Sequence, residues 1–184
     1  MNHRRKETNV KLSCDINTEN ETLLNGEYTF CRTKRFIFGE KTYACENIVE
    51  KEQKVALGDW SKYADKDFSG SGVYKTLFAR PNGLKEKLVL DLGEVKYTCE
   101  VFLNGTSLGV KTLSPYRYEI PVALIQEENE LKIRVSNTIA NELLSTKTFD
   151  KWEKWQLSPY FEKALHFSKD YLASGLFGPV KLKY

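Results

Sequence analysis

The chain has 184 residues, a net charge of +3, and Phe, Tyr or Trp at 12% of its positions. A chain of this length can bury one sizeable core and is too short for two, so we predict a single domain. Acidic and basic residues are interspersed, and without a broad positive field neither nucleic acid nor a membrane surface is expected as a partner. The many aromatic residues favour a sheet-rich protein.

The N-terminus does not have the pattern of a signal peptide, because no apolar stretch follows its basic residues. No run approaches the roughly 18 consecutive apolar residues that a membrane span needs. We therefore expect a cytoplasmic location, or an extracellular one if the chain derives from a longer, exported parent.

Residues 1–20 are polar and charged, and we predict a tail there, followed by one β-sandwich domain over residues 21–184. A strand is expected after an Asn-Gly turn, with Tyr28 and Phe30 on one face. Residues 35–45 then predict a strand, a turn and a second strand, because turn residues separate two runs rich in aromatic residues.

Four cysteines are present, at positions 14, 31, 45 and 99. They form no CxxC pair and the chain has only two histidines, so a structural zinc site is not expected. Cys31 and Cys45 flank the predicted hairpin, and a disulfide between them is the alternative to two free thiols. Cys99 falls on the apolar side of a strand, which predicts a buried free thiol.

Two loop features between residues 59 and 72 have more than one interpretation. Trp60 either plugs the core or displays its ring for a ligand to stack on. Residues 65–72 form an acidic turn, but Thr76 stands at its twelfth position, where a helix–loop–helix calcium site needs a glutamate. We therefore expect no cofactor, and a structural calcium ion held in another geometry is the alternative.

The strongest local signal lies at residues 97–109. Apolar side chains occupy every second position from Tyr97 to Leu103, with Phe102 as the apolar exception on the polar face. Such alternation predicts a half-buried strand, because successive side chains point to opposite faces. Asn104-Gly105 follows directly, and both residues tolerate positive φ, so a hairpin is predicted there.

Two more alternating runs flank this hairpin, at residues 88–92 and 131–135. We predict that these runs and the central strand form one antiparallel sheet with one face toward water. Residues 113–121 begin as a loop and become a short strand, since Pro115 and Pro121 fit a loop or a sheet edge. Val180 to Tyr184 alternates again and predicts the last strand.

Residues 148–167 differ in character from the rest of the chain. Phe149, Trp152 and Trp155 recur at three-residue spacing, which predicts a short helical insertion in an otherwise all-β protein. The many short strands and turns, without any βαβ rhythm, predict an antiparallel β-sandwich.

Eight motifs follow one another in the order and at the spacing of a known domain. They are Asp59-Trp60, 68–74, 90–95, 100–109, 114–117, 129–137, Asn141-Glu142-Leu143 and 174–180. Together they resemble the sugar-binding, jelly-roll domain of glycoside hydrolase family 2. The resemblance is closer still to the C-terminal domain of related rhamnosidase-like enzymes. It covers residues 57–184, with 20–56 adding further strands.

The resemblance implies a galactose-binding-domain-like β-sandwich that is not catalytic itself and packs beside a separate catalytic domain. It also implies carbohydrate as a ligand and a glycoside hydrolase catalytic domain as a partner. One departure concerns Glu142, because members of the family often have arginine there.

Our function hypothesis is a carbohydrate-binding accessory module with weak affinity for an oligosaccharide. Sugars are held by aromatic rings against their C–H faces and by planar polar groups against their hydroxyls. The candidate contacts are Trp60, Tyr116, Arg117, Asn137, Trp152 and Trp155. Each has a structural alternative: a loop anchor for Tyr116, a strand-end cap for Asn137, and core packing for the three tryptophans.

The alternative function is an interaction or scaffold domain that packs against a separate catalytic domain and binds no sugar. Catalysis by this chain alone is not expected. No carboxylate pair lies in an apolar motif of the kind that tunes a glycosidase acid, and neither His3 nor His166 has a partner motif for nucleophilic catalysis. No catalytic residue is therefore predicted.

Overall fold

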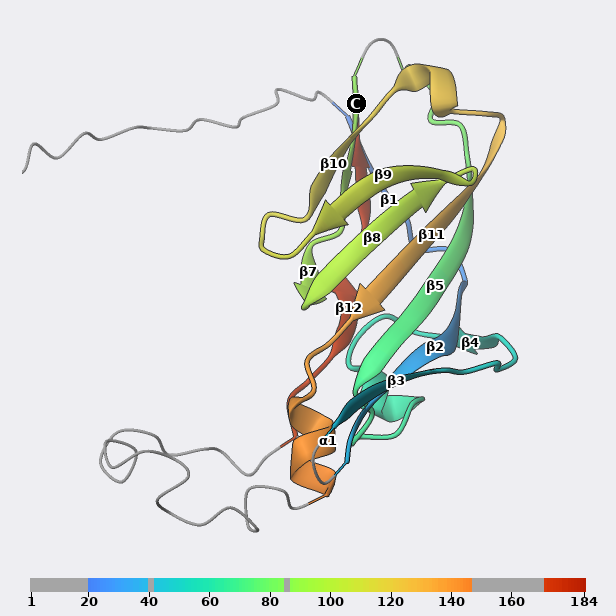
Figure 1. Ribbon diagram of the computed structural model, residues 1–184. Coiled ribbons are helices and arrows are strands. Elements are labelled where there is room, and N and C mark those ends of the chain that lie inside the picture. Colours follow the sequence, from blue (N-terminus) through green and yellow to red (C-terminus); the bar gives the residue numbers. More distant parts are fainter. Residues whose placement is uncertain (1–19, 40–41, 85–86, 147–170) are drawn as a thin grey trace, which may run out of the picture.

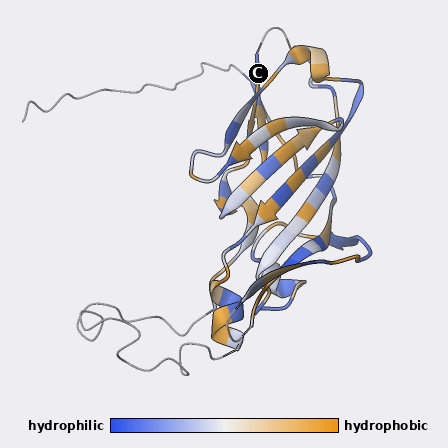
Figure 2. Ribbon diagram, in the orientation of Figure 1, coloured by the Kyte–Doolittle hydropathy of each residue, from blue (hydrophilic) through white to orange (hydrophobic). Residues whose placement is uncertain are grey.

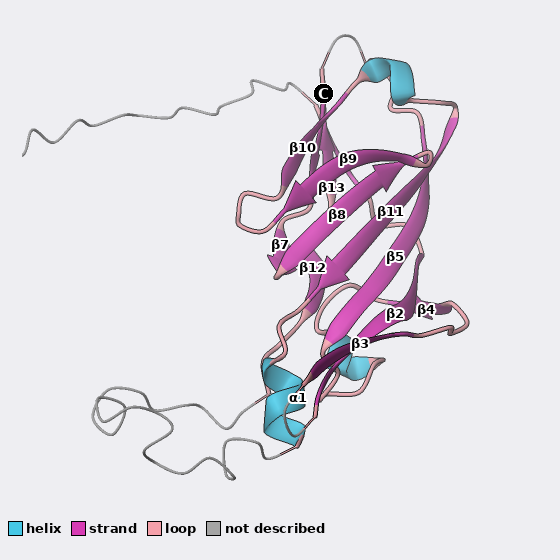
Figure 3. Cartoon of the chain, viewed as in Figure 1, coloured by secondary structure: helices cyan, strands magenta, loops and turns pink. Residues whose placement is uncertain are grey.

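The computed structural model describes residues 20–39, 42–84, 87–146 and 171–184. Within these ranges the chain forms two antiparallel sheets that pack face to face, with short loops at both ends (Figures 1 and 3). This architecture confirms the predicted all-β sandwich.

Among the described residues, seven strands form the larger sheet. Six are in the order β3 (Tyr43–Asn47), β2 (Tyr28–Phe38), β5 (Gly70–Ala79), β11 (Glu128–Ser136), β8 (Thr98–Leu103) and β9 (Thr106–Lys111), and β4 (Gln53–Val55) pairs with β2. Over the same ranges the smaller sheet has the order β1 (Glu21–Leu23), β13 (Lys181–Lys183), β6 (Leu88–Asp91) and β10 (Arg117–Ile120).

The remaining elements are short and lie outside the two main sheets. The strands β7 (Glu94–Lys96) and β12 (Gly175–Gly178) pair with each other. The helical elements described are η1 (Trp60–Lys62), η2 (Val122–Leu124) and α1 (Ala140–Ser145). In these parts of the chain, no helix has the length and apolar character that crossing a membrane requires.

The core lies between the sheets and is filled by every second side chain of the central strands. Figure 2 shows apolar and polar residues alternating along the strands of the larger sheet. Val101 and Ile133 face each other across β8 and β11, and Leu90 comes from the opposite sheet; all three are fully buried. Each such side chain contributes about 1.5–3 kcal/mol by leaving water.

The prediction that residues 88–92 share a sheet with the central hairpin is wrong. Strands β8 and β11 do pair, but β6 lies in the smaller sheet, where Leu90 is opposite Tyr118 on β10 and Leu182 on β13. The physical reason is that both inner faces of a sandwich require the same alternation. A period of two therefore shows that a strand is half-buried without showing to which sheet it belongs.

The Asn104-Gly105 hairpin between β8 and β9 is confirmed. Both residues have positive φ, at 49° and 82°. The Asn104 side chain also ties the turn to its surroundings. Its amide nitrogen donates to the Leu124 carbonyl (2.8 Å), and its oxygen accepts the Glu130 N–H (2.9 Å). The turn is thereby connected both to β11 and to η2.

The hairpin of β2 and β3 also forms, and its register keeps two cysteines apart. Cys45 lies opposite Phe36, which is five residues from Cys31 along β2. At the usual rise of a strand this separation is about 16 Å, far beyond the Cα distance that a disulfide allows. Cys31, Cys45 and Cys99 are accordingly free, and Cys99 is buried as predicted.

Helix α1 was not anticipated from the sequence. It is anchored by Asn141, whose side chain accepts the Leu172 N–H (2.7 Å) and donates to the Leu172 carbonyl (2.9 Å). The buried Glu142 pairs with Arg35 on β2 at 3.4 Å. The predicted helical insertion near 148–167 and the tail up to residue 19 lie outside the described residues.

We predict that Gly105→Ala lowers the free energy of unfolding by about 1–2 kcal/mol, the cost of a left-handed conformation for a residue with a Cβ. Nothing lies within 4 Å of that added atom, so the effect isolates the backbone. Gly39→Ala is the matched control in the other hairpin, because its Cβ meets Thr42 at an ordinary 3.5 Å without positive φ. Urea unfolding that showed equal losses in both variants would contradict this account.

Candidate functional site

Trp60 belongs to the core and has no exposed face for a ligand. Only 1% of the residue is exposed, and its ring packs on Phe68 with 5.2 Å between ring centroids. Asp59 fixes the approach to η1, because its carboxylate accepts the N–H groups of Ser61 (3.1 Å) and Ser174 (3.2 Å). Of the two interpretations that the sequence allowed, the structure gives Trp60 the core role.

Asn137 is buried and joins the end of β11 to two other segments of the chain. Its oxygen accepts the Gly70 N–H (2.7 Å), and its nitrogen donates to the Phe68 carbonyl (2.9 Å) and to Ser174 Oγ (3.1 Å). The side chain therefore caps the end of β11 by bonding to a neighbouring segment. Each hydrogen bond that the structure describes for this side chain therefore serves the fold.

Tyr116 is also buried, and its hydroxyl donates to the Tyr97 carbonyl. Burial raises the pKa of this hydroxyl. The contact anchors the loop before β10 to the start of β8. Tyr116 is thus the loop anchor that the sequence analysis gave as the alternative to a sugar contact. The other two candidates, Trp152 and Trp155, lie outside the described residues.

Arg117 is the candidate that the structure places at the surface. Its side chain is 45% exposed, and its Nε donates to Asp91 Oδ2 at 2.8 Å. The same oxygen accepts Lys183 Nζ (3.0 Å), and the other oxygen accepts the Gly93 N–H (3.1 Å). Asp91 thus connects β6 with both of its neighbours, β10 and β13.

The electrostatics of Asp91 follow from these contacts. Burial by itself raises the pKa of the carboxyl group, but the Gly93 N–H, the Lys183 ammonium and the Arg117 guanidinium together outweigh burial. The pKa of Asp91 therefore lies below its usual value. The carboxylate stays ionised and holds the Arg117 side chain in one orientation.

A groove opens beside Arg117, where β9 at the edge of the larger sheet approaches β10 at the edge of the smaller one. We call it the Arg117 groove; its volume is about 360 Å³. Its apolar lining comes from Val89, Leu108, Pro115 and Tyr118. Its charged lining comes from Lys111, Arg117 and Glu119. The volume is at the lower end of the range for small-molecule sites.

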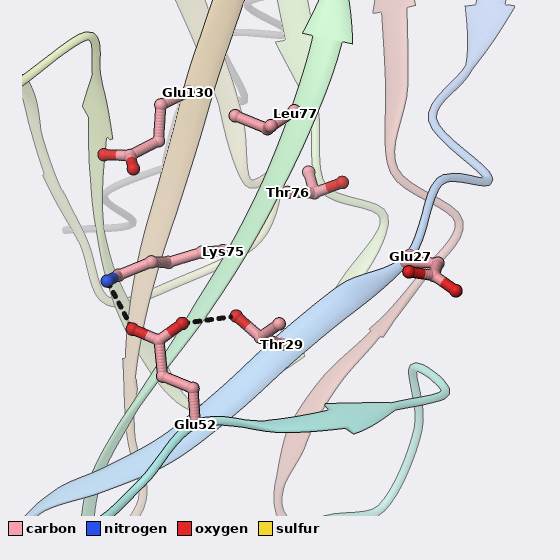
Figure 4. Close-up of a pocket in the computed structure, with 7 residues that line it drawn as sticks. All are labelled: Glu27, Thr29, Glu52, Lys75, Thr76, Leu77 and Glu130. Atoms are coloured by element: carbon pink, nitrogen blue, oxygen red, sulfur yellow. Dashed lines mark hydrogen bonds and ion pairs between the residues drawn. The ribbon is translucent and has the colours of Figure 1, made fainter.

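A second groove crosses the outer face of the larger sheet (Figure 4). We call it the Glu52 groove; its volume is about 470 Å³, and it is lined by Glu27, Thr29, Glu52, Lys75, Thr76, Leu77 and Glu130. Figure 4 shows Lys75 and Thr29 converging on the Glu52 carboxylate from neighbouring strands. The Lys75 and Thr29 hydrogen bonds lower the pKa of Glu52.

The polar groups of the Glu52 groove largely satisfy one another. Glu52 is taken by Lys75 and Thr29, and Glu27 pairs with Lys54. Leu77 is its exposed apolar residue, at 70%. This arrangement is typical of a solvated sheet face, and it leaves few polar groups to meet a ligand.

In the described part of the chain, no group of three or more His, Cys, Asp or Glu gathers that could hold a metal ion. In the acidic turn at 65–72, Asp65 accepts a hydrogen bond from Arg32 at 2.8 Å. Calcium binding at this turn stays a prediction from the sequence.

Several residues of the Arg117 groove were not singled out from the sequence. The alternation of the strand at 117–120 places Arg117 and Glu119 on the same face, so local pattern could have found Glu119. Asp91 meets Arg117 through the pairing of β6 with β10, which are distant in the sequence. Lys111 lines the groove because the edges of the two sheets pack together, for which the sequence has no local signal.

Comparisons with known proteins agree with the fold. No protein-family model matches the chain. It is 28% identical over 163 residues to a protein of Formosa agariphila named "Putative beta-glucuronidase", and this match covers 68% of the chain. Among solved structures, the rhamnosidase from Novosphingobium sp. PP1Y is 28% identical and superposes with a TM-score of 0.60 over 90% of the chain.

A Bifidobacterium dentium beta-glucuronidase complexed with coumarin-3-O-glucuronide shares the fold, with 20% identity and a TM-score of 0.58 over 92% of this chain and 30% of that one. The chain spans only 13% of the Formosa protein and 15% of the rhamnosidase. It therefore corresponds to one domain-sized part of these enzymes. The predicted resemblance to a domain of family 2 and rhamnosidase-like glycoside hydrolases is confirmed.

We predict that Asp91→Asn destabilises the protein by about 1–2 kcal/mol at pH 7, because the variant loses charge-assisted hydrogen bonds. A lowered pKa means that the stabilisation by Asp91 is present above about pH 4 and is lost as the pH falls through the folded-state pKa. The difference between the two proteins should therefore shrink at pH 3 and below. Asp67→Asn is the control, since Asp67 forms no ion pair with any residue that the structure describes; a constant difference across pH would refute the role given to Asp91.

Proposed function

We propose that the chain is a non-catalytic accessory domain of a glycoside hydrolase and that it binds a saccharide weakly in the Arg117 groove. One observation carries this proposal: a surface arginine, held in one orientation by Asp91, borders a groove that has both apolar and charged walls. The relatives named above support the placement beside a catalytic domain, since the chain matches only a small share of each.

The chemistry of the groove suits a sugar. A pyranose ring presents C–H groups that pack on apolar side chains such as Leu108 and Pro115, and hydroxyls that bond to charged groups at the rim. Arg117 offers donors, and Glu119 offers an acceptor. The groove is small and shallow, so we expect dissociation constants in the millimolar range, about −4 kcal/mol.

We predict that nuclear magnetic resonance titration with oligosaccharides shifts the amide signals of β9 and β10. Leu108→Ala should lower the affinity about three- to tenfold, since a buried apolar contact of a few methylene groups is lost. Leu77→Ala is the matched control, because Leu77 belongs to the Glu52 groove and should leave the affinity unchanged. Titrations that shift no signal with neutral or acidic oligosaccharides, or only signals of the outer sheet face, count against the proposal.

A second candidate function, a scaffold domain without sugar binding, is favoured by the edge strand β3. All five of its residues are exposed. Tyr43 is 70% exposed and stacks on Phe38 with 4.8 Å between ring centroids. An exposed edge strand with aromatic side chains is a usual place for protein association.

For this second function we predict that Tyr43→Ser reduces the binding of a hydrophobic dye and any self-association seen by sedimentation. Tyr171→Ser is the control, since Tyr171 is exposed at 36% in a different part of the chain. A strictly monomeric protein that binds no dye would argue that the exposed strand has no docking role.

A further inference from the structure

We propose that the Arg117 groove selects anionic saccharides, those that carry a carboxylate or a sulfate group, over neutral ones. This inference rests on the proposed function and adds the class of ligand to it. It follows from how the cations of the groove are held, which of their nitrogens have partners, and how the charges of the two grooves differ.

The Arg117 guanidinium is oriented with its terminal nitrogens available. The group is planar, so the bond from Nε to Asp91 at 2.8 Å sets the direction of both terminal nitrogens. Neither of these nitrogens has a partner among the described residues. Two parallel N–H groups in this fork match the two oxygens of a carboxylate or a sulfate better than they match a single hydroxyl.

Asp91 does not neutralise the positive charge beside the groove, because its one carboxylate pairs with two cations. Its Oδ2 accepts both Arg117 and Lys183, at 2.8 and 3.0 Å. The carboxylate is 13% exposed, whereas the Arg117 side chain is 45% exposed. The negative charge therefore lies below the surface, and positive charge faces the groove.

A second cation enters the groove from the other sheet. Lys111 ends β9, and its ammonium nitrogen lies 5.5 Å from the centroid of the Tyr118 ring. Lys111 forms no ion pair with a described residue, and the contact that the structure shows for its ammonium group is the Tyr118 ring. Arg117 and Lys111 thus flank the groove from the edges of different sheets.

Glu119 is the opposing charge. It lies on the same face of β10 as Arg117, two residues along, and it also lines the groove. Its carboxylate repels an anion and sets an upper limit on the selectivity. Removing this charge should therefore strengthen the binding of an anionic ligand.

The Glu52 groove has the reverse balance and serves as an internal comparison. Three carboxylates and one ammonium line it, whereas two cations and one carboxylate line the Arg117 groove. An anionic saccharide drawn by charge should therefore perturb β9 and β10 and leave the outer face of β5 unchanged. This location distinguishes charge-guided binding from unspecific adhesion.

The test compares an acid with its neutral methyl ester, which share a skeleton and differ in charge, and adds a sulfated sugar as a third probe. The probes are trigalacturonic acid, its methyl ester and a sulfated galactose trisaccharide, each titrated into the whole chain at 20 and 200 mM NaCl. We expect the acid to bind about three- to tenfold more tightly than the ester at low salt, and the ratio to fall at high salt as the charges are screened. The sulfated arm shows whether the groove prefers sulfate to carboxylate.

Three variants and one control locate the effect. Arg117→Gln and Lys111→Gln should each bring the ratio of acid to ester affinity toward one, and Glu119→Gln should raise it. Lys62→Gln, at an exposed lysine in η1, should leave it unchanged. Lys111 forms no ion pair with a described residue, so Lys111→Gln removes no such contact from the fold. This variant therefore still tests the proposal if Arg117→Gln fails to fold.

The outcomes separate the two proposals. Equal affinity for acid and ester, with shifts in β9 and β10, would overturn the selectivity and leave saccharide binding intact. A ratio that Lys111→Gln does not change would also overturn it. No binding by any probe would remove the proposed function itself, and shifts confined to the Glu52 groove would refute the assignment of the site.

Discussion

The whole structure depends on the burial of alternating side chains between two sheets. Strands β8 and β11 pair along their length and place Val101 and Ile133 inward, and β6 supplies Leu90 from the other side. Backbone polar groups of these strands are satisfied within the ladders, so mostly apolar side chains fill the space between the sheets. What is left for recognition is the periphery: loops, outer faces and the edges where the sheets end.

The Arg117 groove is a consequence of that arrangement. It forms where the edge strands of the two sheets come together, and its charged groups come from both. Asp91 is central to it because its carboxylate joins β6 to β10 and β13, while Arg117 projects from β10. A site of this kind rests on rigid strands, so its geometry is set by the packing of the core. Under our proposal, this groove holds a saccharide without taking part in its cleavage.

Of the four candidate sugar contacts that the structure describes, three are used by the fold. Trp60 fills the core, and Asn137 satisfies buried backbone groups of Gly70 and Phe68. Residue type alone does not separate these roles, because a tryptophan or an asparagine serves equally well in a core or in a binding site. Burial decides between them, and burial depends on contacts between distant parts of the chain. The groove residue Lys111 and the neighbouring Asp91 were missed because the packing of two sheet edges and the pairing of β6 with β10 place them beside Arg117.

The amino-acid sequence by itself determined those features of the structure that depend on residues close together in the chain. The strand alternation, the Asn104-Gly105 turn, the free Cys99 and the all-β class all follow from local patterns and local backbone preferences. Only the tertiary structure decided which sheet contains residues 88–92, which predicted contacts are buried, and which cations share a groove. These are questions of pairing across the chain, and a period of two is the same for every strand that could pair.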